Sequence, residues 1–111
     1  MSAELNSADW AERANNRETP RKPVHMLAEL RLAIGQKFKV SVVDLSQTGF
    51  RVETGNHMEL GTRVYLAIPE LNSLPANITW SDETVYGCAF LHPLHASVFE
   101  HIAREYPPLA Q

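Results

Sequence analysis

The sequence predicts a mainly-β fold in which six antiparallel strands form a barrel or a sandwich and one α-helix follows them. Three observations support this prediction. Apolar residues alternate with polar ones over most of the chain, polar turns separate the alternating stretches at short intervals, and the apolar period becomes helical near the C-terminus. The 111 residues are enough for one domain with one hydrophobic core.

The six predicted strands each place apolar side chains on one face, as the period of two requires. Gly35 and Gln36 form the first predicted turn, residues 56–61 a loop, and Asn72 with Ser73 a later turn. The apolar residues of the strands, in chain order, are Val24, Met26, Ala28, Leu30 and Leu32; Phe38, Val40 and Val42; Phe50 and Val52; Val64, Leu66 and Ile68; Ala76, Ile78 and Trp80; and the run from Val85 to Leu91.

The C-terminal segment is expected to be a helix that covers part of the core. Pro93 suits a helix start, and Ser97 with Glu100 forms a capping box if the helix begins later. The apolar residues that recur at helical spacing are Leu94, Val98, Ile102 and Tyr106, with Phe99 beside them.

Composition restricts the class of function. A formal net charge of −3 argues against a general nucleic-acid binder, although a small anionic ligand needs only a local basic patch. The single cysteine, Cys88, excludes an internal disulfide and suits a reducing cytoplasm, where we expect the protein to act. The N-terminus lacks the apolar run of a signal peptide, and no window resembles a membrane span.

Two apolar runs flank a polar turn with the pattern Asp44-x-Ser46-x-x-Gly49. We expect Gly49 to supply a positive φ, and Asp44 and Ser46 to bond nearby amides while their carboxylate and hydroxyl face outward from the sheet. Such a pattern by itself is also compatible with a simple turn. Upstream, Arg17 and Arg21 form Arg-x-x-x-Arg in a stretch that prolines keep extended, and Asp44 follows Arg21 by 23 positions.

The two motifs at this spacing resemble those of the PilZ domain, a family of bacterial receptors for the second messenger cyclic di-GMP. The resemblance covers roughly residues 17–105. Within that range, Trp80 and the stretch Gly87-Cys88-Ala89-Phe90 in the last strand also resemble the family. It implies a six-stranded split barrel with a C-terminal helix. Residues 1–16 would be a flexible N-terminal arm, residues 17–106 the PilZ-like domain and residues 107–111 a tail.

The resemblance assigns cyclic di-GMP binding to Arg17, Arg21, Asp44, Ser46 and Gly49. Guanidinium groups match guanine O6 and N7 or phosphate oxygens in pairs, and a carboxylate accepts from guanine N1–H and N2–H₂. Ser46 would bond a phosphate or a guanine, and Gly49 would let the backbone come close. Binding would order the N-terminal arm and so signal to an unidentified effector protein, without an enzymatic reaction or a cofactor.

Three further residues are weaker candidates for the ligand site. Arg13 would compensate for Asn16, which stands where many family members have a basic residue. Arg51 is either a phosphate contact or an ordinary outward strand residue. Trp80 would stack beside a guanine, but it is two residues from Ile78 and is as readily a core or half-buried residue.

The sequence also suggests four other interpretations. A hydrolytic set would need a histidine beside Ser46, and no nucleophile elbow is present. A metal site would have to use His92, His95 and His101, without the usual completing ligands. A nucleic-acid-binding barrel would need an aromatic platform. The strongest alternative is a PilZ-like adaptor that contacts proteins and binds the nucleotide weakly or not at all.

Overall fold

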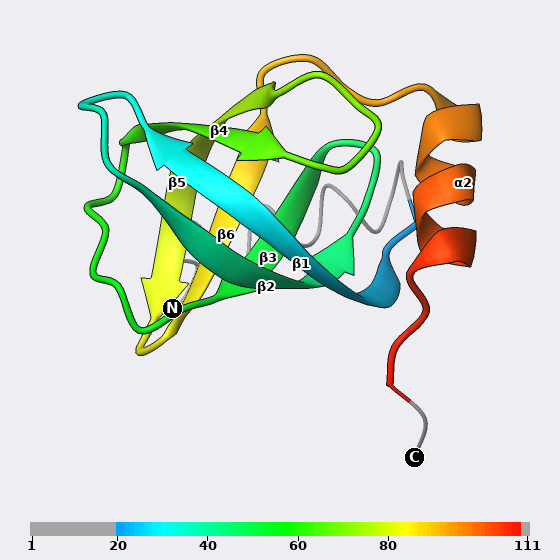
Figure 1. Ribbon diagram of the computed structural model, residues 1–111, viewed down its shortest axis with the longest axis horizontal. Coiled ribbons are helices and arrows are strands. Elements are labelled where there is room, and N and C mark those ends of the chain that lie inside the picture. The colour runs from blue at the N-terminus through cyan, green and yellow to red at the C-terminus, as the bar shows by residue number, and fades with distance from the viewer. Residues whose placement is uncertain (1–19, 110–111) are drawn as a thin grey trace, which may run out of the picture.

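Six antiparallel strands close into a barrel, and one helix stands at one end of it (Figure 1). The computed structural model describes residues 20–109. The neighbours around the barrel run β1-β2-β3-β6-β5-β4, and β4 pairs with β1 to close it. The predicted six-stranded antiparallel barrel with a C-terminal helix is therefore confirmed. The elements are β1 (Lys22–Leu32), β2 (Lys37–Leu45), β3 (Gly49–Glu53), β4 (Arg63–Ala67), β5 (Leu74–Asp82), β6 (Val85–Phe90) and α2 (Ala96–Glu105).

The barrel interior is filled by the apolar residues that the alternation predicted. Val42, Val52, Val64, Leu66 and Ala76 have no exposed surface, because each points inward from its strand. Every predicted inward residue of the first four strands is buried except Phe38, which packs against the core from a partly buried position. Period two is therefore a reliable guide to the core of these four strands.

A β-bulge in β2 breaks the alternation next to the polar turn. Val42 pairs with Val52, but Asp44 pairs with Arg51, so β2 has one extra residue, Val43, between the two pairs. A bulge rotates the following residues to the opposite face. Asp44 consequently lies on the outer face of the barrel, although it stands two positions after the fully buried Val42.

A second bulge lies in β5, where Ile78 pairs with Cys88 but Trp80 pairs with Gly87. Since Gly87 and Cys88 are adjacent, Ile78 and Trp80 point to opposite faces of the sheet. Ile78 is in the core, and Trp80 is a half-buried residue of the outer surface. The expectation that these two residues share a face is wrong because period two does not hold across a bulge.

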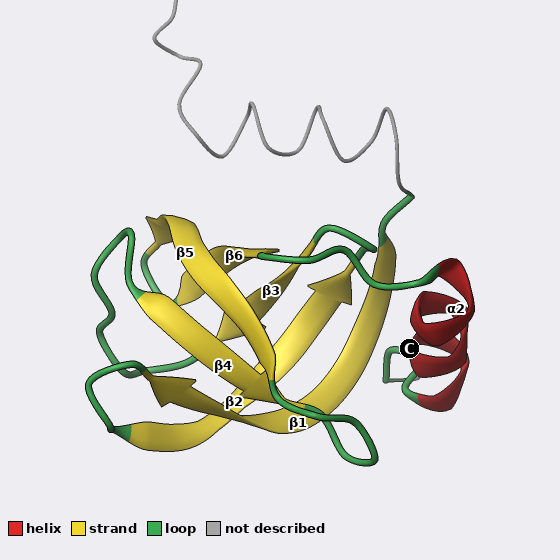
Figure 2. Ribbon diagram, turned by 90° about the horizontal axis from the view of Figure 1, so that it is seen from above, coloured by secondary structure: helices red, strands yellow, loops and turns green. Residues whose placement is uncertain are grey.

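Helix α2 packs Phe99 and Ile102 against one end of the barrel (Figure 2). The backbone N–H of His25 in β1 donates to the carbonyl of Tyr106, at 3.0 Å, just after the helix. The predicted capping box is wrong: the helix begins at Ala96 after His95, and no side chain caps its N-terminus. Among residues 20–109, none of the helical structure has the length and apolar character of a membrane span.

Cys88 is free and buried on β6. Burial disfavours the thiolate and raises the pKa of Cys88 to about 12. Only the thiolate is reactive, so a cysteine that stays protonated is unreactive. Cys88 therefore serves as a packing residue of the core.

Candidate functional site

The turn between β2 and β3 is built around the hydroxyl of Ser46. This oxygen accepts from the backbone N–H groups of Thr48 and Gly49, both at 3.1 Å, and the Ser46 N–H donates to the Gly49 carbonyl at 2.9 Å. Ser46 is only 1% exposed. The expectation that its hydroxyl faces outward is therefore wrong, because the turn folds around that hydroxyl and uses it to satisfy two amides.

Gly49 is required by a close approach of two strands. A Cβ added at this position would lie 2.4 Å from the backbone oxygen of Cys88 on β6, a distance at which something must shift. The φ angle of Gly49 does not lie in the left-handed region. The predicted positive φ is thus wrong, and the reason for a glycine is the packing of β3 against β6.

The turn is also fixed to the segment that leads into α2. The Leu94 N–H donates to the Gln47 carbonyl at 2.8 Å, and the Gln47 side-chain amide donates back to the Leu94 carbonyl at 2.9 Å. The Phe90 N–H donates to the Thr48 carbonyl at 2.9 Å. Neither Gln47 nor Leu94 was a candidate from the sequence, since partners 47 positions apart leave no local signal.

Arg21 and Asp44 meet across β1 and β2. Pro23 pairs with Asp44, so Arg21, just before β1, reaches the outward carboxylate. Nε and Nη2 of Arg21 donate to Oδ2 of Asp44 at 3.1 and 2.5 Å. The two side chains are 15% and 18% exposed, so the ion pair is largely shielded from water. The structure brings together these two residues, which the sequence separates by 23 positions.

Arg51 shares the same carboxylate. Its Nη2 lies 3.2 Å from Oδ2 of Asp44, so one oxygen lies between two guanidinium groups. Two cations against one anion leave a net charge of +1 in this cluster, on a chain whose net charge is −3. The cluster is therefore a local basic patch on an acidic chain.

An aromatic surface extends the cluster along the sheet. The Arg51 guanidinium carbon lies 5.8 Å from the centre of the Trp80 ring, within cation–π range. Gly87 lies between them, and a Cβ there would fall 2.0 Å from Nε1 of Trp80. Gly87 therefore lets the indole lie flat across β6. Asp44, Arg51, Gly87 and Trp80, on β2, β3, β6 and β5, are cross-strand neighbours. We refer to these four residues, together with Arg21, which pairs with Asp44, as the Asp44 row.

The Asp44 row can bind a flat, hydrogen-bonding anion. It presents guanidinium donors, a carboxylate acceptor and an aromatic face in one line. From β2 to β5 there are three strand spacings, about 14 Å along the sheet at about 4.8 Å each. That length accommodates more than one nucleobase.

Two of the remaining sequence candidates have no described position, and the others point to no second site. Arg13 and Arg17 lie outside the described residues. Among residues 20–109, no group of three or more His, Cys, Asp or Glu side chains could hold a metal ion. The hydroxyl of Ser46 is buried and bonded to its own turn, which gives no support to a hydrolytic set.

Comparison with known proteins gives one result for the whole domain. A family model described as PilZ domain matches residues 15–106, that is 92 of the 111 residues. No curated protein matches the chain. The matched range includes every strand, the polar turn, Arg21 and helix α2. On this match, which extends over more than four fifths of its length, the chain belongs to the PilZ domain family.

Proposed function

We propose that this protein is a cyclic di-GMP receptor that passes the signal to a partner protein. The observation that carries the proposal is the pairing of Arg21 and Arg51 with one carboxylate, Asp44, beside the ring of Trp80. These are the groups that guanine and phosphate recognition require, and they lie on the barrel of a PilZ domain.

Arg21 and Asp44 are proposed to recognise a guanine from two sides. The arginine fork matches the O6 and N7 acceptors, and the carboxylate accepts from N1–H and N2–H₂. Their ion pair supports this role, because it already holds both side chains on the outer face. A ligand that replaces one of the two hydrogen bonds of this pair would contact side chains that are already held in position, so binding would cost little side-chain entropy.

Arg51 and Trp80 are proposed to bind the second half of the ligand. The indole offers a flat surface for a purine, and the Arg51 guanidinium beside it can bond a phosphate.

Ser46 and Gly49 remain in the proposed site, but as residues that shape the turn and not as ligand contacts. They shape the turn that presents Asp44, because Ser46 is buried and Gly49 packs against Cys88. Arg17, and Arg13 with it, are proposed as ligand contacts on the family pattern.

Signalling is proposed to follow from contacts between the site and helix α2. The polar turn is bonded to Leu94, before the helix, and β1 is bonded to Tyr106, after it. Lys22, next to Arg21, lies with its ammonium 5.8 Å from the centre of the Phe99 ring. A ligand that moves Arg21 would therefore be sensed at α2 and by a protein bound there. No reaction on the ligand and no cofactor is needed for this function.

One observation favours the second candidate, an adaptor that contacts proteins and binds the nucleotide weakly or not at all. Asp44 is already satisfied by two arginines from within the chain. A cluster of this kind can serve a purely structural purpose, holding β1, β2 and β3 together.

Calorimetric titration of cyclic di-GMP into the wild type, Arg21→Ala and Arg51→Ala tests the proposal. An arginine contact of this kind is worth about 1–3 kcal/mol, so each variant should bind about 5-fold to 150-fold more weakly. Arg31→Ala is the matched control, since Arg31 is an exposed strand arginine that stacks on Tyr65 at 4.4 Å. It should bind like the wild type. Cyclic di-AMP should bind poorly, because adenine presents a donor where guanine has O6.

One outcome would reject the receptor function, and another would reject the proposed site. Wild-type protein that gives no heat at several temperatures would leave the adaptor as the better account. Binding that Arg21→Ala and Arg31→Ala weaken equally would place the ligand elsewhere on the barrel.

A further inference from the structure

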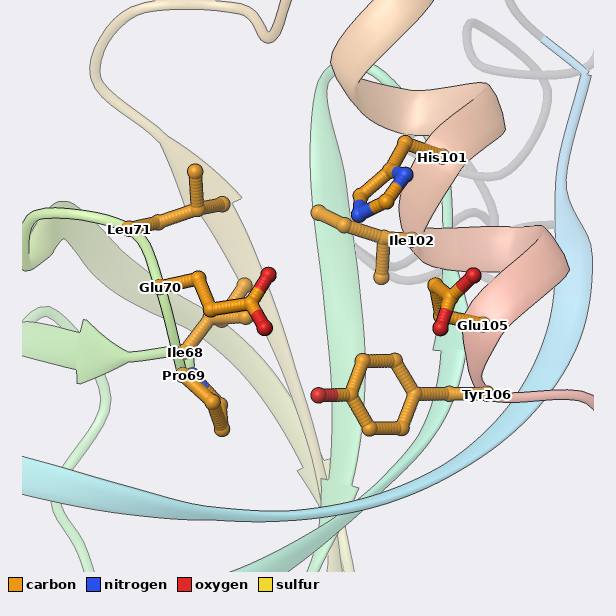
Figure 3. Close-up of a pocket in the computed structure, with 8 residues that line it drawn as sticks. All are labelled: Ile68, Pro69, Glu70, Leu71, His101, Ile102, Glu105 and Tyr106. Atoms are coloured by element: carbon orange, nitrogen blue, oxygen red, sulfur yellow. The ribbon is translucent and has the colours of Figure 1, made fainter.

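A small groove separates helix α2 from the loop between β4 and β5, outside the Asp44 row (Figure 3). Its volume is about 90 Å³, well below the roughly 300–1,000 Å³ of small-molecule sites. The groove therefore has room for one side chain and is too small for a nucleotide. We call it the helix groove, and its lining residues are Ile68, Pro69, Glu70, Leu71, His101, Ile102, Glu105 and Tyr106.

The helix groove combines apolar walls with an acidic mouth. Ile68 and Ile102 are buried in its wall, and the ring of Tyr106 extends from the end of the helix towards the loop. Glu70 and Glu105 are both exposed. Figure 3 shows the Glu70 carboxylate extending from the loop towards the helix, on which Glu105 lies. An occupant with an apolar stem and a cationic end would complement both parts.

The two carboxylates differ from Asp44 in having no internal partner. Within residues 20–109, all ion pairs involve Arg21, Arg51 or His57, and neither Glu70 nor Glu105 takes part in one. Neither forms a side-chain hydrogen bond with another described residue. A cation that reaches this mouth would therefore gain ion pairs without first displacing a cation of the protein.

The backbone holds Glu70 at the mouth in a conformation that glycine would adopt more easily. The Leu71 N–H donates to the Ile68 carbonyl at 3.0 Å, with Pro69 and Glu70 as the two central turn residues. Glu70 has a φ of 74°, in the left-handed region. A residue with a Cβ is sterically disfavoured in this region, so glutamate can be replaced by glycine here without loss of fold stability.

We propose that the helix groove binds an arginine side chain of a partner protein. The alkyl stem of the arginine packs against Leu71, Ile102 and Tyr106, and its guanidinium bonds Glu70 and Glu105 at the mouth. A guanidinium suits two carboxylates better than an ammonium, because its planar fork has donors on more than one edge and also stacks on a tyrosine ring. This proposal stands independently of nucleotide binding, since none of its residues belongs to the Asp44 row.

An NMR titration of the ¹⁵N-labelled full chain at pH 7.5 and low salt tests the proposal. The probe is the peptide acetyl-Gly-Leu-Arg-Leu-Gly-amide, and its control is the same peptide with citrulline, which keeps the shape of arginine and removes the charge. The arginine peptide should shift the amide signals of Leu71, Ile102 and Tyr106, with a dissociation constant of about 1 mM or tighter. The citrulline peptide should leave them unchanged.

Glu70→Gly and Glu83→Gly form a matched pair of variants. Glu83 is also exposed and also has a positive φ, 58°, but it lies in the turn between β5 and β6. Each substitution removes one negative charge and relieves the same backbone strain, so neither should lower the melting temperature. Glu70→Gly should weaken the arginine peptide at least tenfold, and Glu83→Gly should bind it like the wild type.

Several results would overturn the proposal. Shifts that cluster away from the groove, equal effects of the two peptides, or equal binding by Glu70→Gly and Glu83→Gly would each do so. Because the titration contains no cyclic di-GMP, its outcome is separate from that of the receptor experiment.

Discussion

The Asp44 row and the helix groove are two charged regions of one small barrel. They differ in whether their carboxylates form ion pairs within the protein. In the Asp44 row, one carboxylate contacts two guanidinium groups that neighbouring strands bring to it. In the helix groove, two carboxylates are held at the mouth of an apolar hollow and have no internal ion pair among the described residues. The first region is stabilised by its own contacts, whereas the second gains its contacts only when a partner supplies them.

The contrast comes from how each region is built. Strand register determines which side chains lie next to one another in the Asp44 row. A slip of one residue would turn the side chains of that strand to the other face of the sheet, so the register is strongly specified. The helix groove depends on α2, whose contacts with the barrel are made mainly through Phe99 and Ile102. Changes in the first region should therefore alter fold stability, and changes in the second should alter binding while the fold is kept.

The largest expected effect is that of Gly49→Ala. The added Cβ would collide with the backbone oxygen of Cys88, and backbone cannot move aside as a side-chain end can. Overpacking of this kind typically costs about 1–3 kcal/mol, and we expect the upper end, about 3 kcal/mol. Urea denaturation followed by circular dichroism would measure the free energy of unfolding.

Gly55→Ala is the control for Gly49→Ala, because a Cβ at Gly55 has no atom within 4 Å. It should change the free energy of unfolding little or not at all. If both variants unfold at the same urea concentration, the packing of β3 against β6 is looser than the structure indicates.

An intermediate effect on the free energy of unfolding is expected when a carboxylate of each region is neutralised. Asp44→Asn removes a charge that is 18% exposed and paired twice, so it should cost about 1–2 kcal/mol in the free energy of unfolding. Glu105→Gln removes an exposed charge without an internal partner and should cause no measurable change. Thermal unfolding of both variants at the same salt concentration would compare them. Equal stability of the two would mean that the ion pairs of the Asp44 row contribute nothing to the fold.

Most of the fold was predictable from the sequence because alternation is a local signal. The buried residues of β1 and β4, such as Leu30 and Leu66, follow it without exception. It failed at the bulge in β5, where the extra residue cannot be recognised without knowing the partner strand. Alternation alone therefore groups Trp80 with Ile78, from which the structure separates it.

The candidate site was predictable in its residue types and less so in their roles. The motif pattern pointed to Arg21 and Asp44, and the structure pairs them. The roles of Ser46 and Gly49 depend on Thr48 and Cys88, and the contacts that decide them exist only after folding. A motif identifies residues that matter without saying whether each contacts a ligand or shapes the loop that does.

The smallest expected effect concerns the contact between Arg51 and Trp80. Because Arg51 also pairs with Asp44, a single substitution removes two interactions, and a double-mutant cycle of Arg51→Ala with Trp80→Leu is needed to isolate one. At a partly exposed site the coupling should be about 0.5–1 kcal/mol. Arg51→Ala should also change the fluorescence of Trp80, measured in a Trp10→Phe background because the chain has two tryptophans. Arg31→Ala, which removes the stacking on Tyr65, should leave that emission unchanged. A coupling of zero would mean that Trp80 is held by Gly87 and β6 without help from the arginine, and that its face is open to a base.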